Sequence, residues 1–546
     1  MHHRGAHGQR GPIRADRLRC DISKGCVATV IPERLSQKPL DGLRVVVTAI
    51  DLEQSEHRGI AVYSKALIRC LKEAGAEVWL LTGVDPATGD LGSKQLPRAT
   101  RELIRNARVL NALSAGHITE NEPWIVRYFP LARNWNSLRN QMNKLSAILF
   151  GSKHYSAKKI EPIHIQSQID NPYLRHERLS YLQNIDGVLW ARSIFFFSMW
   201  KAKLKKGPIS IDLKGFDALF TTCPLNIKPS LNCTFVQTIH DLIPLEYAQT
   251  SDNVEVFAER LAACLPARRL HVSESTQRKY NSALLKCASN HAQSPHAQSP
   301  VESLEKVGIQ PPSLKFPGWL FSDPKDQIIH DAQTLDYPPS CYLLREANAN
   351  DPPKTRRLKP FSYLLFNSSV EPRKNLLFLV QSYIESNLSS QGIHLCVTGK
   401  LKRDAYSAAV RELVKHEPSI ILTGYINEST KHDLYLNTLI LLSPSLVEGF
   451  GIPVLDAACL GSPTLASDCA SHRQIQGLYD FSRNVLLCNT LNTGSWASAM
   501  KALAESNSHM PIQASQERQR RLHRYNQIAP RVTKSFTDQI CSLLMD

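Results

Sequence analysis

Short apolar segments alternate with helix-like stretches in the C-terminal half of the chain, and this alternation limits the possible folds more than any other feature. Between the apolar segments lie stretches with helical periodicity, such as NLLFLVQSYIES and DAYSAAVRELVKHE. The apolar segments themselves are SYLLFN, IHLCVTG, SIILTGY, TLILLSP and PTLASD. Strands that alternate with helices predict a doubly wound parallel sheet.

A second α/β region is predicted nearer the N-terminus. LRVVVTAI is typical of a buried strand, IAVYSKALIRCLKEAG of an amphipathic helix that ends at Gly75, and EVWLLTG of another strand. FDALFTTCP and TFVQTIHDLIP repeat the sequence of a strand followed by a loop, whereas residues 84–210 are polar and irregular and receive no assignment. The fold class is therefore α/β with two Rossmann-like sheets.

Changes in composition divide the chain into five parts. Low-complexity HAQSP repeats near residues 291–300 indicate a surface loop in the N-terminal domain. The parts are a disordered basic tail (1–40), an N-terminal Rossmann-like domain with insertions (41–312), a Pro-rich linker (313–360), a C-terminal Rossmann-like domain (361–513) and basic C-terminal helices (514–546), candidates for packing back on the N-terminal domain.

Composition and cysteine spacing predict a cytoplasmic protein. Of its 546 residues 42% are hydrophobic and 21% charged, which is typical of a globular protein. Its 13 cysteines include no CxxC pair, no apolar signal region opens the chain, and no apolar run reaches the ~18 residues that span a bilayer.

The net charge of +16 predicts anionic partners. Nucleic acid is not expected, because zinc-finger spacing and RNA-binding aromatic signatures are missing from the sequence. The segment WARSIFFFSMWKAKLKKG (190–207) combines an aromatic block with lysines and is a candidate for peripheral contact with an anionic membrane at its inner face. A buried helix with a solvated lysine end is the other interpretation.

Several chemically capable residues directly follow the predicted strands. Ligands of open parallel sheets bind beyond the carboxyl ends of the strands, so these residues are expected to gather at one site. They are Gly59, His240, the pair Arg373 and Lys374, and Glu448. Two cations, a histidine, an acid and glycine-containing helix starts suit a sugar linked to a nucleoside diphosphate.

The stretch PSLVEGFGIPVLDAACLGSP predicts a loop and a helix start. Glycines allow a phosphate to approach the backbone, and a helix start attracts anions. Gly449, Phe450 and Gly451 are therefore candidates for donor binding, and Asp456 is expected in the first helical turn. A capped helix after a tight turn is the alternative for this stretch.

Four motifs in this order resemble the retaining GT-B glycosyltransferases of family 4, whose members carry an E-x7-E motif. The motifs are RGIAVYSKAL, TIHDLIPLEY, VEPRKN and EGFGIPVLDA. The resemblance is close over about 360–480 and patchy at 43–83 and 216–280. It implies a GT-B fold with two domains facing across a cleft, and a hexosyltransferase that moves a sugar from a nucleotide-diphosphate sugar to a glycan or lipid-linked acceptor in polysaccharide or glycoconjugate synthesis.

The resemblance also implies roles for individual residues. Arg373 and Lys374 neutralise the donor diphosphate, and Glu448 and His240 lie at the reacting sugar. Asp456 accepts a hydrogen bond from the ribose, and Gly59 lets the first loop approach the diphosphate. Asp456 replaces the second glutamate of the motif, so its ribose contact would be longer or bridged by water.

Other departures concern the loops. Asn367 and Ser368 stand where relatives often have Gly and then Thr or Arg, and Ala61 replaces a frequent glycine. The chain contains no D-x-D triplet, so no metal and no other cofactor is expected, and basic residues would stabilise the leaving diphosphate. The alternatives are a GT-B epimerase or sugar-phosphate synthase, or a non-catalytic protein that binds nucleotides or glycans.

Overall fold

The structure is a computed structural model, and its description covers most of the chain. The described residues are 38–54, 57, 59–84, 96–115, 154–156, 158–160, 176–191, 193–229, 233–247, 253–291, 304–316, 342–345 and 355–546. Most of the predicted basic tail, the HAQSP repeats after residue 291 and much of the predicted linker lie outside them. Pro39–Asp546 forms one compact unit, and all the elements below belong to it.

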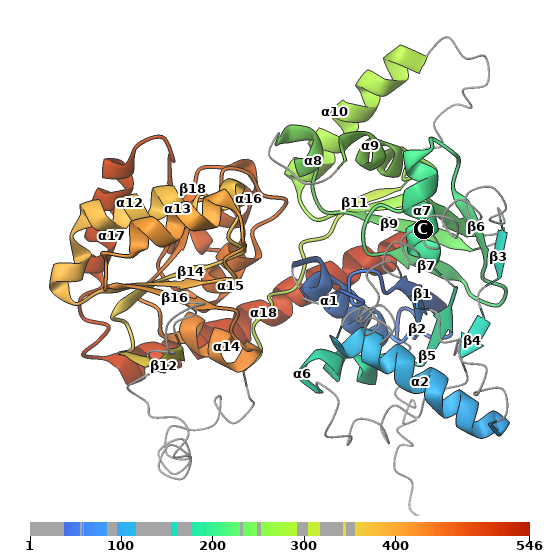
Figure 1. Cartoon of the computed structure of the whole chain (residues 1–546), viewed down its shortest axis with the longest axis horizontal. Helices are drawn as coiled ribbons and strands as arrows, with labels where there is room; N and C mark the ends of the chain where they lie inside the picture. The colour runs from blue at the N-terminus through green and yellow to red at the C-terminus, as the bar shows by residue number, and fades with distance from the viewer. Residues whose placement is uncertain are drawn as a thin grey trace, which may run out of the picture. The chain divides into compact units, whose positions relative to one another are not determined.

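The N-terminal half contains an eight-stranded sheet in the order β11-β10-β9-β7-β1-β2-β5-β4, in which only the β4–β5 pair is antiparallel (Figure 1). Its strands are β1 (Arg44–Thr48), β2 (Glu77–Thr82), β4 (Lys158–Ile160), β5 (Gly187–Trp190), β7 (Ala218–Thr221), β9 (Thr234–Ile239), β10 (Arg268–His271) and β11 (Glu305–Val307). A small parallel sheet joins β3 (His154–Ser156), β6 (Ile209–Asp212) and β8 (Ile227–Pro229). The helices of the N-terminal half are α1 (Gly59–Glu73), α2 (Arg98–Ala115), α6 (His176–Leu179), α7 (Ile194–Lys203), α8 (Ile243–Glu246), α9 (Val254–Ala262) and α10 (Glu274–His291), with the 3-10 helix η2 (Ser180–Asn184).

The C-terminal half contains a six-stranded sheet that is parallel throughout, in the order β16-β15-β14-β17-β18-β19. Taken in chain order this is the arrangement 3-2-1-4-5-6 of the doubly wound fold. Its strands are β14 (Tyr363–Asn367), β15 (His394–Thr398), β16 (Ile420–Gly424), β17 (Ile440–Ser443), β18 (Thr464–Ser467) and β19 (Val485–Cys488). The prediction of an α/β fold with two Rossmann-like sheets, the architecture of the GT-B fold, is confirmed.

Helices cover both faces of the C-terminal sheet (Figure 1). One face carries α12 (Leu376–Ser386), α13 (Ala405–Val414) and α17 (Thr493–Ser506), and the other carries α14 (Glu428–Asn437), α15 (Ile452–Leu460) and α18 (Ala514–Met545). The remaining elements are α16 (Ala470–Gln476), the 3-10 helices η4 (Pro372–Lys374), η5 (Leu388–Gln391) and η6 (Phe481–Arg483), and an antiparallel pair of β12 (Tyr342–Arg345) and β13 (Thr355–Leu358). The sequence did not predict this pair within the linker.

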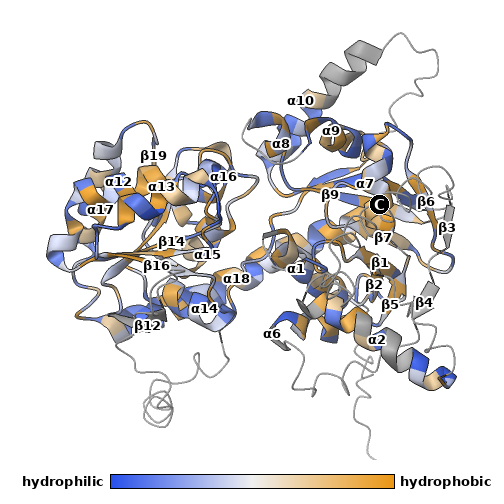
Figure 2. Ribbon diagram, in the orientation of Figure 1, coloured by the Kyte–Doolittle hydropathy of each residue, from blue (hydrophilic) through white to orange (hydrophobic). Residues whose placement is uncertain are grey.

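Alternation along the strands builds the core on both faces of each sheet. In β14, Leu364 and Phe366 pack with α12 and α17, whereas Tyr363 and Leu365 pack on the opposite face with α14 and α15. This is the two-residue period of a strand that is buried on both sides. Figure 2 shows the hydrophobic residues concentrated on the strands and on the helix faces that meet them.

The C-terminal residues form one continuous helix, α18, where the sequence left one or two open. Arg521 of α18 is fully buried and donates hydrogen bonds to the carbonyl groups of Leu436 (3.1 Å) and Thr438 (2.8 Å). Further along, the ring of Phe536 meets that of Tyr63 in α1 edge to face, with the ring centres 5.7 Å apart. The helix therefore contacts elements of both halves.

Residues 84–210, which the sequence left unassigned, contain parts of the N-terminal sheet. Strand β5 and helix α7 fall in this range. In α7, Ile194 and Phe195 are buried, but the side chain of Phe196 is 40% exposed. The helix is thus neither fully buried nor wholly on the surface. Within the described residues no helix combines the length and hydropathy needed to cross a bilayer.

Candidate active site

The strand order of the C-terminal sheet determines where a ligand site can form. Strands β14 and β17 lie side by side although β15 and β16 come between them in the chain. The helices that follow such a pair turn to opposite faces, which leaves a crevice at the carboxyl ends of the two strands. The chain beyond β14 leads to η4 with Arg373 and Lys374, and the chain beyond β17 leads to Glu448. The predicted residues of this half therefore lie at the switch point.

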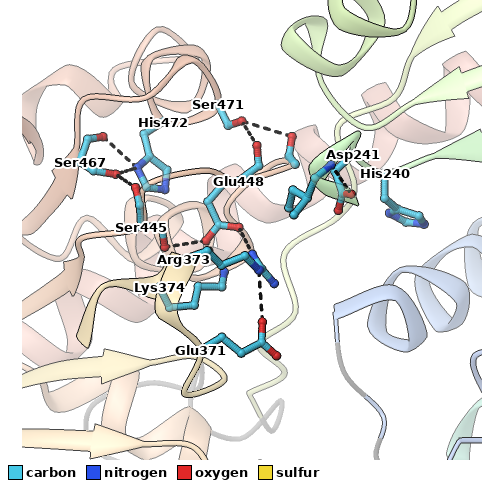
Figure 3. Close-up of polar contacts among 12 residues, drawn as sticks. His240, Asp241, Glu371, Arg373, Lys374, Ser445, Glu448, Ser467, Ser471 and His472 are labelled. Carbon is cyan, nitrogen blue, oxygen red and sulfur yellow. Dashed lines mark hydrogen bonds and ion pairs between the residues drawn. The ribbon is translucent and has the colours of Figure 1, made fainter. Parts of the chain in front are cut away.

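Lys374 and Glu448 form a buried ion pair across these two loops (Figure 3). Their side chains are 8% and 9% exposed. The Ser445 hydroxyl donates to Oε1 of Glu448 at 2.8 Å, and Nη1 of Arg373 lies 3.7 Å from Oε2. A backbone hydrogen bond from Leu446 to the Arg373 carbonyl (2.8 Å) connects the loops directly. The structure thus brings together the two cations and the acid that the sequence singled out.

The cations keep Glu448 ionised. Burial alone would raise the pKa of Glu448, but Lys374 and Arg373, with a smaller contribution from His472, lower it to about 2. Arg373 also pairs with Glu371, 3.2 Å away. Both cations are therefore partnered by carboxylates here, and an incoming diphosphate would bind beside or in place of those partners.

Two glycines shape the loop between Glu448 and α15. A Cβ at Gly449 would lie 2.4 Å from the His240 carbonyl oxygen, so no other residue fits without a shift of the backbone. Gly451 has φ of +107° and caps α15, with Pro453 in the first turn. Phe450 is 5% exposed and belongs to the core, which leaves its predicted donor contact to the backbone.

His240 directly follows β9, as predicted. Its Nε2 lies 2.7 Å from the Thr222 carbonyl oxygen, which can only accept, so Nε2 carries the proton. Burial lowers the pKa of His240, although Thr222 and Asp51 act in the opposite direction, so the neutral ring is favoured. Its Nδ1 is then a hydrogen-bond acceptor, which suits contact with a sugar hydroxyl.

Gly59 is the first residue of α1, in agreement with the predicted helix start. A Cβ at this position would meet Ile452 Cδ1 at 3.7 Å, an ordinary contact. Packing therefore does not require glycine here, and its close approach to a diphosphate stays a prediction.

Asp456 lies elsewhere than the sequence predicted. Helix α15 begins at Ile452, which puts Asp456 in the second turn and not the first. Its carboxylate is 2% exposed and accepts hydrogen bonds from the backbone N–H (2.6 Å) and hydroxyl (2.5 Å) of Ser313. The expected position was wrong because Gly451 caps the helix, so the first turn ends before Asp456. Contact with a ribose stays a prediction.

Sequence reasoning missed four side chains that organise the site. Asp51, after β1, accepts a hydrogen bond from the Thr222 hydroxyl at 2.6 Å, and its charge acts to raise the pKa of His240. Ser445, Ser471 and His472 surround the loop of Glu448 (Figure 3). Asp51 follows a strand and could have been included by that signal, whereas a serine in a loop gives none. Among the described residues, no group of three or more His, Cys, Asp or Glu side chains could hold a metal ion.

Comparison with known proteins agrees with this geometry. Residues 362–506 match the family model of the glycosyl transferases group 1. This match agrees with the expected relationship to glycosyltransferases for the part of the chain that carries Arg373, Lys374 and Glu448, whereas family 4 and the retaining mechanism stay predictions. The match ends at the last residue of α17 and includes the whole six-stranded sheet.

Curated relatives are similar over a short stretch. The serotype-specific mannosyltransferase WbdA of Escherichia coli is 29% identical over 126 residues, which make up 22% of this chain and 15% of that protein. The O-antigen chain mannosyltransferase B of Escherichia coli is 27% identical over 117 residues, 21% of this chain and 31% of that protein. The chain thus spans less than a third of the length of either relative.

Solved structures show distant similarity over nearly the whole chain. The sucrose-phosphate synthase of Thermosynechococcus elongatus has a TM-score of 0.45 and 13% identity, covering 92% of this chain and 100% of that one. WaaG, a glycosyltransferase involved in lipopolysaccharide biosynthesis, has a TM-score of 0.43 and 11% identity, with coverage of 92% and 100%.

Removing the Ser313 hydroxyl tests the environment of Asp456. Ser313→Ala is expected to lower the free energy of unfolding by about 1 kcal/mol, because one charge-assisted hydrogen bond is lost in a buried site.

Asp456→Asn, which can still accept one hydrogen bond, is expected to raise the KM for a sugar donor a few-fold, equivalent to about 1 kcal/mol, with turnover mostly kept. Urea unfolding and steady-state kinetics measure both effects.

The matched control is Ser506→Ala, which removes an exposed serine that bonds only within its own helix, to the Ala502 and Leu503 carbonyl groups. Its unfolding free energy is expected to change by less than about 0.5 kcal/mol. If Asp456→Asn leaves the donor KM at the wild-type value, Asp456 does not contact the donor.

Proposed function

We propose that this protein is a retaining, metal-independent glycosyltransferase that moves a hexose from a nucleotide-diphosphate sugar to a glycan or lipid-linked acceptor. The observation that carries the proposal is the buried arrangement of Lys374, Arg373 and Glu448 at the switch point of a glycosyltransferase group 1 match. Burying an ion pair costs desolvation free energy, so such a pair is weak evidence for stability alone. Carboxylates with strongly shifted pKa values concentrate at functional sites. Polysaccharide or glycoconjugate synthesis is the proposed context, since both relatives are named as mannosyltransferases.

The residues divide the work by charge. Arg373 and Lys374 bind the diphosphate and stabilise the charge that develops on it as the sugar leaves, so that no metal is needed. The α15 start adds backbone N–H groups for the same phosphates. Glu448 stays ionised, holds the cations in place and stabilises positive charge at the reacting sugar carbon. Nδ1 of His240 accepts a hydrogen bond from a sugar hydroxyl. For retention, a leaving phosphate oxygen takes the proton of the acceptor hydroxyl on the same face of the sugar.

Release of nucleoside diphosphate from a panel of nucleotide sugars, with and without EDTA, tests this proposal. A nucleoside diphosphate mannose is the first donor to try, because the relatives carry mannosyltransferase names. We expect slow release with water as acceptor, unchanged by EDTA. Lys72→Ala, which removes a lysine from a surface pair with Asp186, is the control and is expected to keep the wild-type rate. Release that requires a divalent metal contradicts metal independence, and binding without release of any donor indicates a non-catalytic protein.

Peripheral contact with an anionic membrane is the second part of the proposal, with the reaction in the cytoplasm at the inner face of the membrane. Helix α7 and its end expose Phe196 (40%) and Leu204 (39%) beside the exposed lysines 203, 205 and 206. An aromatic and apolar surface next to lysines is typical of interfacial binding to anionic lipid.

Co-sedimentation with vesicles tests this contact. The protein is expected to sediment with phosphatidylglycerol vesicles and much less with phosphatidylcholine vesicles. Phe196→Ser should reduce sedimentation, whereas Ile512→Ser, at an apolar residue that is 87% exposed elsewhere, should not. If Phe196→Ser sediments as much as the wild type, α7 does not contact the membrane.

A further inference from the structure

His472 is a fully buried histidine, and its hydrogen bonds fix the proton on one of its two ring nitrogens. It lies in α16, and its Nδ1 is 2.9 Å from the Ser467 carbonyl oxygen. A carbonyl oxygen can only accept, so Nδ1 carries a proton in both the neutral and the charged ring. Any titration of His472 therefore takes place at Nε2.

Nε2 of His472 has no hydrogen-bond partner within the described part of the chain, although it is buried. It lies against Gly451, the residue that caps α15, because a Cβ at Gly451 would be 2.9 Å from Cδ2 and 3.1 Å from Nε2 of the imidazole ring. Buried polar atoms without partners are uncommon and call for an explanation. Here the unpaired nitrogen faces the helix start where the donor phosphates are proposed to bind.

The surroundings of His472 connect it to Glu448 as well (Figure 3). The Ser467 hydroxyl donates to the Ser445 carbonyl at 2.5 Å, and the Ser445 hydroxyl donates to Glu448 at 2.8 Å. The neighbouring Ser471 donates to the carbonyl oxygens of Glu448 (2.8 Å) and Gly449 (3.2 Å). Ser471 at the start of α16 thus holds the backbone of the Glu448 loop, and Ser467 at the end of β18 is connected to the carboxylate through Ser445.

The groups that surround His472 act on its pKa in opposite directions. Glu448 faces it from the loop before α15, and Cys469 faces it from the start of its own helix. Burial lowers the pKa of His472, but Cys469, Glu448 and the Ser467 carbonyl together raise it above its usual value. Lys374 and Arg373, on the other side of Glu448, offset part of the negative charge. A diphosphate would add negative charge and favour the imidazolium further.

We propose that His472 takes up a proton at Nε2 when a nucleoside diphosphate binds at the start of α15, and that it acts as a positioning residue beneath the phosphate site. The proton comes from the solvent and converts neutral imidazole to imidazolium; no other bond changes. This inference rests on the proposed function, because it assumes that the donor phosphates bind at α15. Its consequence is that diphosphate affinity falls as the pH rises through the pKa of His472.

Calorimetric titration of the whole protein with GDP and with UDP, in buffers of different ionisation enthalpy, counts the protons taken up on binding. His472→Asn is the variant of choice, because its amide N–H can replace Nδ1 as the donor to the Ser467 carbonyl while the titratable nitrogen is removed. His271→Asn is the matched control, since His271 is also fully buried but lies on β10 of the N-terminal half. We expect proton uptake by the wild type and by His271→Asn to exceed that of His472→Asn.

The pH dependence provides a second readout that does not require the variant to fold. Between the pKa of His472 in the free protein and its higher pKa in the complex, the wild-type Kd is expected to rise with pH, by at most about tenfold per unit for one linked proton, and to level off outside this interval. A wild-type Kd that does not change beyond the titration of the diphosphate itself overturns the proposal. Equal proton uptake by the wild type and His472→Asn overturns it too. If neither diphosphate binds the wild type, the proposed donor site fails, and this inference fails with it.

Discussion

Glu448→Gln is expected to reduce turnover at least about tenfold, a change of roughly 1.4 kcal/mol in the activation barrier. Glutamine keeps the shape of the side chain but removes the negative charge that faces the reacting sugar. The variant also leaves Lys374 buried without its carboxylate, and breaking a buried pair in this way costs up to about 3–5 kcal/mol of stability. Turnover at saturating donor and the free energy of unfolding in urea measure the two effects separately.

Glu517→Gln is the control for the effect of stability on activity. Glu517 has a side chain that is 8% exposed and pairs with two arginines, Arg520 and Arg521, much as Glu448 pairs with two cations. Its replacement is expected to lower stability while turnover of the folded protein stays at the wild-type value. If Glu448→Gln changes only the donor KM, or loses no more turnover than Glu517→Gln, Glu448 does not act on the reacting sugar.

Lys374→Ala is expected to lower kcat/KM for the donor by about 2–4 kcal/mol in transition-state free energy, because one charge-assisted contact with the diphosphate is lost. The structure shows Lys374 to be 7% exposed and paired with Glu448, so the variant is also expected to be less stable.

A double-mutant cycle with Lys374→Ala and Glu448→Gln isolates the coupling between the two residues. Their effects on stability are expected to be strongly non-additive, since the first change leaves the buried carboxylate of Glu448 without its lysine and the second removes that negative charge. An unchanged kcat/KM in Lys374→Ala would exclude a contact between this lysine and the donor.

Acid unfolding gives an independent view of the same pair. The pKa of Glu448 in the folded protein is about 2, below its usual 4.5. A carboxyl whose folded pKa is depressed stabilises the fold above its unfolded pKa, and this stabilisation is lost as the pH falls from about 4.5 toward 2. Glu448→Gln should therefore lose less stability than the wild type over this interval. Parallel stability curves for the two proteins between pH 4.5 and 2 would contradict the ionised, paired state of Glu448.

Local patterns in the sequence were sufficient for the fold and for part of the site. The apolar runs that predicted β14 and β17 are buried on both sides, so their composition was distinctive, and the residues after them could be located from strand ends alone. His240 was found in the same way after β9. Parallel pairing then places these loops together, which explains why Arg373, Lys374 and Glu448 were chosen correctly as neighbours.

Other features depend on contacts between residues far apart in the chain, which no local pattern contains. The partner of Asp456 is Ser313, 143 positions away, in a region that the sequence assigned to a linker. His472 was missed because nothing in a single sequence shows that a histidine is fully buried against a glycine of another helix. Strand β5 was missed because it is only four residues long and its flanks are polar.

Hydrogen–deuterium exchange of the wild type with and without saturating nucleoside diphosphate tests most directly whether the donor site lies where we propose. GDP and UDP are used in turn, since the base is not specified. Binding is expected to slow exchange of the amides in residues 371–376 and 445–456, which comprise the loops after β14 and β17 and the start of α15. Exchange in α7 and α17 is expected to stay unchanged. Protection confined to other segments, or no protection by either diphosphate, would contradict the account.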